Sequence, residues 1–266
     1  MSITVLMAVY SGDRADFFDQ SLHSLSYQEL KPNEVVLVIN GHVGQEIIDI
    51  INKYENDLNI IRVQMPINEG LAVALNEGLK YCHYEYIARM DADDISKYER
   101  MSKQSEYLDK NTDIDVVGSW ITEISERGNI LRTITYPESN DKCYSFFKFR
   151  NPMAHPSVMF RRRFFQKAGN YPERSTVDQD SLLWMKGFLN NCKFANIQES
   201  YLYFRVNYSM YLRRNWKKAY IIFRNRICIT RRLKFGLVGY LGAASLFFVY
   251  LTPIGLKKLL YRYFRK

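Results

Sequence analysis

Three aspartates crowd the segment Asp91-Ala92-Asp93-Asp94, which directly follows an apolar run at residues 86–90. Two carboxylates one residue apart at the end of a buried strand would repel one another and would be costly to remove from water. A divalent cation removes that cost, and hard carboxylate oxygens suit Mg2+ or Mn2+, which also bridge diphosphate oxygens. The run therefore predicts a metal and diphosphate site. Asp94 is expected to cap the next helix rather than to contact the ion, and the alternative for the whole run is a solvated turn.

The elements around this run alternate between strand-like and helix-like stretches. Strands covered on both faces are predicted by near-continuous apolar runs at residues 3–10, 35–39, 59–63 and 86–90. Helices are predicted between them, by apolar residues at helical spacing, at residues 16–28, 47–51 and 71–79. Such a series implies right-handed crossovers and a mainly parallel sheet. Ligands bind such sheets at the carboxyl ends of the strands, and the aspartates follow one of these ends.

Beyond Asp94 the pattern changes. A helix is expected at residues 97–110, followed by a strand at 116–121 and a hairpin turn at 127–129. Two further helices are expected at residues 164–168 and 181–188, and from residue 209 onward the chain is helical, basic and aromatic in character.

The net charge of +9 is unevenly distributed. From Ser200 onward there are 15 Lys or Arg and no Asp or Glu, so residues 1–199 hold 22 basic and 28 acidic side chains. Residues 235–256 carry no charge, a length that would permit a membrane span. Basic clusters flank this segment on both sides, against the tendency of positive charge to stay inside. We expect an interfacial or re-entrant helical pair on the cytoplasmic leaflet, with a true span or a soluble bundle as alternatives.

Other classes of protein are disfavoured by what the chain contains. The four cysteines are scattered without a C-x-x-C pair, so we expect reduced thiols and no cysteine metal cluster. The chain starts on a strand-like run without a basic leader, so its N-terminal part is expected in the cytoplasm. The charge-free core of the tail argues against nucleic-acid binding, and the lack of a Gly-rich phosphate loop argues against a nucleotidyltransferase.

Several segments, taken in order, resemble the family-two glycosyltransferases, which are inverting enzymes of GT-A fold. The similarity is strongest to the bacterial branch that builds capsules, O-antigens and exopolysaccharides. It runs from Ile3 to Val206 and includes residues 68–79, 85–94, 115–120, 151–160 and 168–172, then Asp180, Trp184 and residues 193–196. The joint order of these segments is far more specific than the acidic run alone.

The resemblance implies roles for the matching residues. Asp93 would coordinate Mg2+ or Mn2+ at the diphosphate, and Asp91 would contact the ribose or the metal. Arg89 and Arg100 could pair with the acidic run or with phosphate. The nucleotide-sugar, with UDP as the expected nucleotide, would be bound by Ala8, Val9, Tyr10, Asn40, Asn68, Gly70, Asp91 and Ala92.

Asp180 falls where the family has its acidic catalytic pair. The resemblance implies that it is the general base, which takes the proton of the acceptor hydroxyl as that oxygen attacks the anomeric carbon from the opposite face. Asp178 is the competing candidate, and Asp180 could instead be a first-turn residue favoured by the helix dipole. His155 is expected either to order its loop or to take part in catalysis. Trp184 is expected in the core, with an aromatic wall for the acceptor sugar as the alternative.

Two departures from the family leave a second hypothesis open. Asn40 stands where an aspartate usually contacts the base, although it can still hydrogen-bond a pyrimidine. Asn207 stands where a histidine sometimes binds the metal. The second hypothesis is therefore a non-catalytic protein that binds nucleotide-sugars or acts as a scaffold.

Together these observations predict an α/β fold of GT-A (Rossmann-like) type with a mainly parallel sheet. Residues 1–206 would form the transferase domain, with a nucleotide-sugar half at 1–96 and an acceptor and catalytic half at 97–206. Residues 207–266 would form a basic helical tail on the membrane. The predicted activity is metal-dependent hexosyl transfer from a UDP-sugar to a lipid-linked or growing surface polysaccharide, at the cytoplasmic face of the inner membrane and without a nucleic-acid partner.

Overall fold

The computed structural model describes residues 2–175, 177–206 and 216–252. The strands are β1 (Ile3–Val9), β2 (Glu34–Asn40), β3 (Ile60–Met65), β4 (Tyr86–Arg89), β5 (Ile95–Ser96), β6 (Val116–Ser125), β7 (Ile130–Ile134), β8 (Met159–Arg161) and β9 (Phe194–Val206). The helices are α1 (Ala15–Ser26), α2 (Gln45–Leu58), α3 (Leu71–Leu79), α4 (Arg100–Lys110), α5 (Asn140–Phe146), η1 (His155–Ser157, a 3-10 turn), α6 (Arg162–Ala168), α7 (Gln179–Leu189), α9 (Trp216–Arg232) and α10 (Gly236–Leu251).

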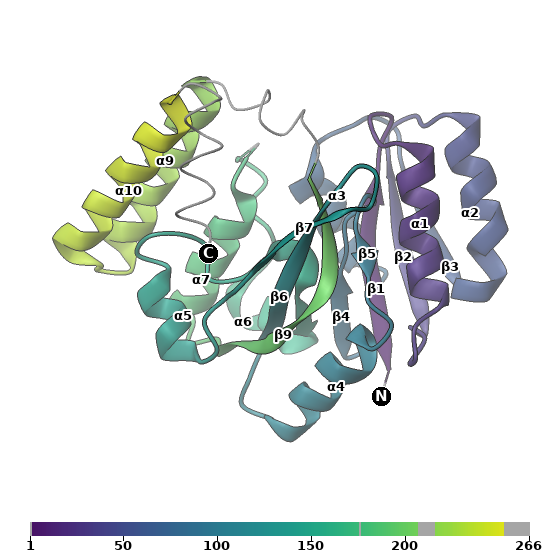
Figure 1. The fold of residues 1–266 in the computed structure, drawn as a ribbon, viewed down its shortest axis with the longest axis horizontal. Helices are drawn as coiled ribbons and strands as arrows, with labels where there is room; N and C mark the ends of the chain where they lie inside the picture. The colour runs from purple at the N-terminus through teal and green to yellow at the C-terminus, as the bar shows by residue number, and fades with distance from the viewer. Residues whose placement is uncertain (1, 176, 207–215, 253–266) are drawn as a thin grey trace.

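A nine-stranded sheet forms the centre of the molecule (Figure 1). Its strands run in the order β3-β2-β1-β4-β8-β6-β9-β5, and β7 pairs with β6 outside that path. The first part is parallel, because β1 pairs with both β2 and β4 and β2 pairs with β3. β2 is buried at all seven positions, as a strand covered by helices on both faces must be.

Helices cover both faces of the sheet and create two apolar cores. The first core joins alternate residues of β1 and β2 to α1, α2 and α4. The second joins the opposite faces of the same strands to α3, α6, α7 and the end of α9. This three-layer arrangement explains why the apolar runs of the first strands are continuous rather than alternating.

The helices and strands predicted for the first ninety residues are confirmed, and so is the hairpin turn between β6 and β7. The expectation of a mainly parallel sheet holds for β1 to β4 but is wrong for the sheet as a whole. β8 is antiparallel to both β4 and β6, and β5 is antiparallel to β9, so the whole sheet is mixed. The sequence pattern does not predict β5, β8 or β9. β5 and β8 are too short to show an alternation of apolar and polar residues. The pairing of β9 with β6 shifts its register near Trp120.

The C-terminal region is helical where the structure describes it. α9 and α10 pack against each other at the end of the molecule opposite α2 (Figure 1), and α9 also packs against α7. Among the described helices, none has both the length and the apolar character that a membrane crossing requires. The four cysteines are free thiols, as expected, and Cys228 of α9 is the exposed one.

The second core depends on Trp184 of α7, which is fully buried. Its ring contacts those of Phe160, Phe164 and Phe194, so the expectation of core packing is confirmed.

Trp184→Ala should therefore lower the free energy of unfolding by about 3–5 kcal/mol in a urea titration. The matched control is Trp216→Ala on α9, where the side chain is 66% exposed and the change should stay within about 0.5 kcal/mol. Similar losses for the two variants would contradict the assignment.

Candidate active site

The candidate donor site lies where the strand order reverses. β1 leads to β2 and β3 on one side, and the chain then returns to place β4 on the other side of β1. In open α/β sheets, ligands bind at the carboxyl ends of the strands at such a switch point. Here those ends carry Tyr10 after β1 and the acidic run after β4. The fold thus places the predicted aspartates at its natural ligand position.

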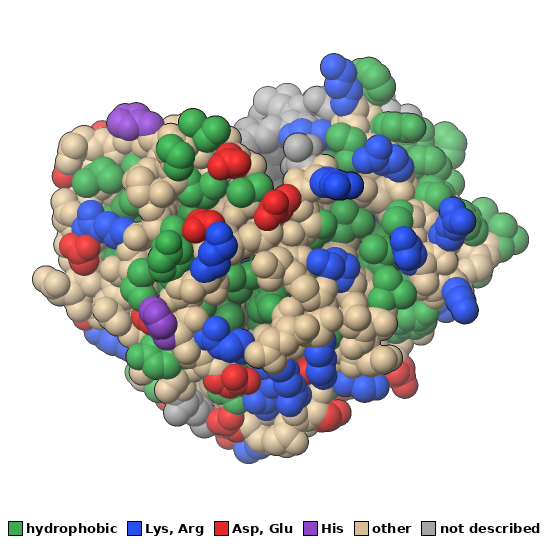
Figure 2. Space-filling view, turned by 180° about the vertical axis from the view of Figure 1, so that it is seen from behind, with side chains coloured by type: hydrophobic (Ala, Val, Ile, Leu, Met, Phe, Trp, Pro, Cys, Tyr) green, Lys and Arg blue, Asp and Glu red, His purple; other side chains and the backbone are tan. Residues whose placement is uncertain are grey.

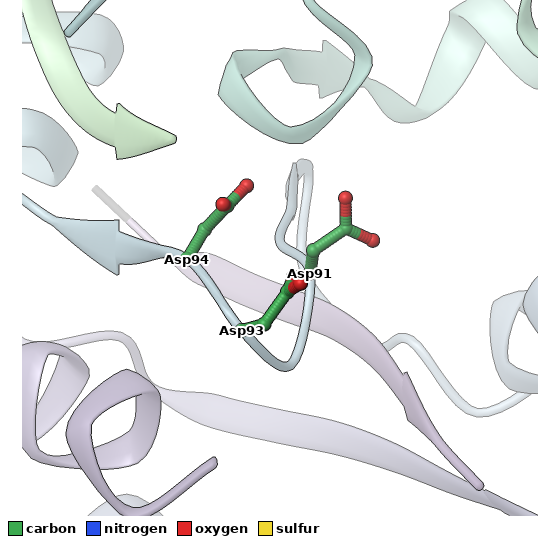
Figure 3. A group of neighbouring side chains, drawn as sticks. All are labelled: Asp91, Asp93 and Asp94. Atoms are coloured by element: carbon green, nitrogen blue, oxygen red, sulfur yellow. The ribbon is translucent and has the colours of Figure 1, made fainter. Parts of the chain in front are cut away.

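Asp91, Asp93 and Asp94 share one tight turn of the loop between β4 and β5 (Figure 3). One carboxylate oxygen from each lies within 4.8 Å of the others. Asp91 and Asp93 are partly exposed, whereas Asp94 is fully buried. Asp94 Oδ2 is a buried acceptor without a hydrogen-bond donor among the described residues. A set of carboxylate oxygens with unused acceptor capacity fits a hard divalent cation such as Mg2+ or Mn2+.

The three carboxylates also shift one another's titration. Burial raises the pKa of Asp93 to about 6, and the charge of Asp91 adds to this shift. Burial raises the pKa of Asp94 well above its ordinary value, with further contributions from Asp93 and Asp91. The loop therefore concentrates more negative charge than its surroundings neutralise, which is the electrostatic condition for binding a cation.

Two buried arginines hold this loop in place. Arg89, the last residue of β4, forms an ion pair with Asp91 through Nη2 and Oδ1. Arg205 of β9 donates from Nε to the carbonyl of Asp93 at 2.9 Å, and its backbone N–H donates to Asp94 Oδ1 at 2.9 Å. The guanidinium of Arg205 also donates to Gln20 of α1, so the loop is tied to two other elements.

The bond from Arg205 corrects the expectation for Asp94. This residue does not cap a helix, because β5 follows it directly and α4 begins only at Arg100. Its side chain instead joins the acidic loop to the neighbouring strand β9. Arg100 is fully buried and donates to the carbonyl of Arg89 at 2.7 Å, so it supports the end of β4 from behind.

The predicted nucleotide-binding residues lie around the same edge of the sheet. Asn40, at the end of β2, donates from Nδ2 to Asn68 Oδ1 at 3.0 Å and accepts the backbone N–H of Glu69 at 3.1 Å. Gly70 precedes α3 with a φ of 92°, a conformation that favours glycine. Asn40, Asn68 and Gly70 therefore form one rigid unit beyond β2.

The end of β1 presents alternating side chains. Ala8 and Tyr10 are partly exposed, whereas the side chain of Val9 is fully buried in the first core. A ligand at this edge could therefore meet Val9 only through its main chain. Ala92, on the acidic loop, is also nearly buried at 5% exposure.

The predicted catalytic aspartate occupies the first turn of α7. Asn151 donates from Nδ2 to Asp180 Oδ2 at 2.7 Å, and burial raises the pKa of Asp180. Asp178, the competing candidate, is hydrogen-bonded to the hydroxyl of Ser181, and burial raises its pKa to about 7. Both aspartates are therefore hydrogen-bonded at the start of α7.

Tyr171 connects the two halves of the site. Its phenol interacts electrostatically with Arg89, Asp180 and Asp91, and its hydroxyl lies 2.9 Å from Nε2 of His155. His155 is buried, and burial together with Arg89 holds its pKa well below the ordinary value. It is therefore neutral at physiological pH, and it orders the loop before β8 rather than supplying charge.

The folded chain thus brings the acidic loop and Asp180 around one buried centre. The sequence patterns do not indicate the hydrogen-bonding roles of Asn151, Ser181 and Arg205. A basic or amide residue within an otherwise apolar strand or loop was the available signal. The prediction for Asn207 concerns a residue outside the described part of the chain.

Comparison with known proteins places this fold and site in a family. The model of the family described as Glycosyl transferase family 2 matches residues 4–169. The chain belongs to this family and is a glycosyltransferase of the hexosyltransferase class. It is 31% identical over 196 residues to the UDP-Gal:alpha-D-GlcNAc-diphosphoundecaprenol beta-1,3-galactosyltransferase of Escherichia coli, covering 74% of this chain and 71% of that protein. It is 32% identical to the O-antigen biosynthesis glycosyltransferase WbnJ of Escherichia coli, over 77% of this chain and 80% of the relative.

Solved structures confirm the GT-A fold. Staphylococcus aureus TarS, in a structure titled as its complex with UDP-GlcNAc, superposes with a TM-score of 0.69 at 19% identity, over 97% of this chain and 78% of that chain. The mannosyltransferase PcManGT of Pyrobaculum calidifontis, in complex with GDP-Man and Mn2+, superposes with a TM-score of 0.66 at 15% identity, over 98% of this chain and 78% of that chain.

The raised pKa of Asp93 has a consequence for stability. Because this pKa lies above its ordinary value, ionisation of the group opposes folding, and the cost grows as the pH rises from about 4 toward 7. Without divalent cations at pH 7.5, Asp93→Asn should raise the free energy of unfolding by roughly 1–2 kcal/mol. Thermal unfolding in buffer with chelator measures this change, and Mn2+ should stabilise the native protein more than the variant.

The matched control is Asp57→Asn, which removes a surface carboxylate paired with Lys31. Its effect should be small at every pH, because exposed ion pairs contribute little. A metal-free Asp93→Asn protein that is less stable than the native chain at pH 7.5 would contradict the electrostatic assignment.

Proposed function

We propose that the enzyme carries out a metal-dependent, inverting transfer of a hexosyl group from a UDP-sugar to a hydroxyl of a lipid-linked or growing surface polysaccharide. The observation that carries this proposal is the cluster of Asp91, Asp93 and Asp94 at the switch point of the sheet. Support for the substrate class comes from relatives whose names specify a diphosphoundecaprenol-linked acceptor and O-antigen biosynthesis. Support for UDP comes from the named donor of the first relative and from the ligand of TarS.

The donor diphosphate belongs at the acidic loop. Asp93 and Asp91 would hold Mg2+ or Mn2+ there, and the ion would act as a Lewis acid that stabilises the departing diphosphate. Arg89 pairs with the carboxylate of Asp91, and Arg205 holds the backbone carbonyl of Asp93. Asn40 has its side-chain carbonyl occupied by Glu69, so its contribution to a bound base would come from the rigid turn that it builds with Asn68.

Asp180 would act as the general base. Burial raises its pKa, which strengthens it as a base toward a sugar hydroxyl at neutral pH. The amide of Asn151 fixes Oδ2 of this carboxylate at 2.7 Å. Inversion follows from a single displacement, in which the acceptor oxygen bonds to the anomeric carbon as the bond to the diphosphate breaks on the opposite face. The proton passes to Asp180, and the electron pair leaves with the diphosphate.

Substitution of the two functional aspartates should separate donor binding from chemistry. Asp180→Asn should lower kcat by roughly 10²–10⁴-fold while UDP still binds, because only the base is removed. Asp93→Ala should abolish turnover and the Mn2+-dependent part of UDP binding. The measurements are nucleoside diphosphate release with a lipid-linked acceptor extract and a thermal-shift panel of nucleotide-sugars with and without Mn2+.

Asp178→Asn distinguishes the competing base, and Asp57→Asn serves as the surface control. Turnover retained in both Asp93→Ala and Asp180→Asn would refute the mechanism. Donor binding without turnover in the native protein, with every acceptor extract tried, would instead support the hypothesis of a non-catalytic nucleotide-sugar-binding protein.

The helices α9 and α10 would place the enzyme on the cytoplasmic leaflet of the inner membrane. Large apolar side chains of α10 are exposed, including Leu237 at 74%, Leu241 at 61% and Phe248 at 66%. Exposed basic residues of α9 and the following turn lie close to them in sequence, namely Lys217, Arg224, Arg231, Arg232 and Lys234. Figure 2 shows hydrophobic and basic side chains gathered together on the side of the molecule that carries these helices. An apolar face with adjoining positive charge is typical of a protein that rests on anionic lipid.

Vesicle binding tests this placement. The triple variant Leu237→Ser, Leu241→Ser and Phe248→Ser should lose most of its cosedimentation with vesicles that contain anionic phosphatidylglycerol. Neutralising Arg224, Arg231 and Arg232 to Gln should weaken binding about fivefold per residue, since each charge contributes about 1 kcal/mol near the surface. Ile67→Ser is the apolar control, because that side chain is 64% exposed elsewhere on the molecule. Equal binding by the native protein to neutral and anionic vesicles would contradict the electrostatic contribution.

A further inference from the structure

The C-terminal helix α9 contributes two buried polar side chains to the region of Asp180. Asn225 and Arg226 are each 6% exposed, whereas Arg224 on the same helix is exposed. Burying a guanidinium is costly unless hydrogen bonds and charges compensate it. The hydrogen-bond partners of Arg226 therefore indicate its role.

Arg226 acts on Asp180 through a single intermediate. Its Nη2 donates to Asn151 Oδ1 at 2.6 Å, and Asn151 Nδ2 donates to Asp180 Oδ2 at 2.7 Å. Its Nη1 donates to the carbonyl of Phe147 at 3.2 Å, which fixes the guanidinium. The amide of Asn151 can satisfy both neighbours in only one orientation, because a flipped amide would turn its NH2 toward the guanidinium and its oxygen toward the carboxylate.

The neighbouring residue Asn225 holds the segment before α7. Its Nδ2 donates to Ser175 Oγ at 3.2 Å and to the carbonyl of Val177 at 3.5 Å. The next residue, Asp178, has a φ of 61°, in the left-handed region that few non-glycine residues adopt. Such a conformation persists only where the surroundings hold it. The helix thus supports both the backbone before Asp180 and the side chain that contacts it.

Arg226 also sets the charge around the aspartate pair. Burial raises the pKa of Asp180 and that of Asp178, and the guanidinium of Arg226 opposes both shifts. The other charged or titratable groups that act on Asp180 are Arg89 of β4, which favours its ionised form, and the phenol of Tyr171. Among the described residues of α9 and α10, Arg226 is the one whose charge acts on this pair.

We propose that Arg226 is a positioning residue of the transfer reaction, which orients the carboxylate of Asp180 through the amide of Asn151. The helix that carries Arg226 is then part of the catalytic apparatus as well as of the surface that faces lipid. This proposal rests on the assignment of Asp180 as the base in the proposed function.

The test compares Arg226→Met with the control Lys110→Met, which removes an exposed cation of α4 whose side chain is 71% exposed, in the full chain. Arg226→Met should lower kcat roughly 10–100-fold with less than a twofold change in the donor KM, because the base is misplaced while the donor loop is untouched. The acidic limb of the pH–rate profile should move to higher pH, since a positive charge that favours the ionised base is lost. Arg226→Lys should return the acidic limb toward its native position, with partial recovery of kcat. Lys110→Met should match the native enzyme in both measurements.

A second substitution keeps the proposal testable if Arg226→Met folds poorly. Asn151→Ala removes the amide that connects Arg226 to Asp180. Once this amide is absent, Arg226→Lys has no connection left to weaken. The kcat of the double variant Asn151→Ala, Arg226→Lys should therefore equal that of Asn151→Ala alone. Independent, multiplicative losses would overturn the proposal, as would an unchanged kcat and pH limb in a folded Arg226→Met protein. If Asp180→Asn is inactive and Arg226→Met is fully active, only the positioning role is refuted. A fully active Asp180→Asn refutes the base assignment and the positioning role together.

Discussion

Three carboxylates and two buried guanidiniums meet at the loop between β4 and β5, and the arrangement of the site depends on how their charges balance. Asp91 is paired with Arg89, and the backbone of Asp93 and the side chain of Asp94 are both bonded to Arg205. These contacts fix the geometry of the loop, while burial and the charges of neighbouring aspartates raise the pKa values of Asp93 and Asp94. In the proposed function, this rigid set of carboxylates would receive a cation together with the diphosphate of the donor.

The order of the strands makes this arrangement possible. β4 lies beside β1 in parallel, which brings the acidic loop to the open edge of the switch point. β9 pairs with β5 directly after the loop, and this pairing delivers Arg205 to Asp94 across more than a hundred residues of sequence. The mixed character of the sheet is therefore part of the site, because the antiparallel contact with β9 supplies the support that a purely parallel sheet would lack.

Local patterns predicted the parallel half of the fold well. β1 and β2 are buried on both faces, so their apolar runs are continuous, and the i, i+4 spacing of leucines marked α3 with its observed bounds. The acidic run could be recognised because its chemistry is unusual after a buried strand. Asp94 was misinterpreted as a helix cap because its partner, the backbone N–H of Arg205, comes from a distant strand. No periodicity in a sequence specifies such a long-range contact, and the same holds for Asn151 beside Asp180.

The basic residues of α9 differ in burial, which the composition of the tail does not reveal. Its many basic residues suggested a uniform electrostatic role, yet burial divides them, since Arg224 faces solvent while Arg226 lies against Phe147 and Asn151. Burial is costly for a guanidinium, so a basic residue is retained inside only where its hydrogen bonds are used. Because α9 packs on α7 and adjoins the apolar face of α10, a force that moves the helix pair also moves the support of Asp180. In the proposed function, contact with lipid and orientation of the base would both act on α9, so the activity would depend on the surface where a lipid-linked acceptor is found.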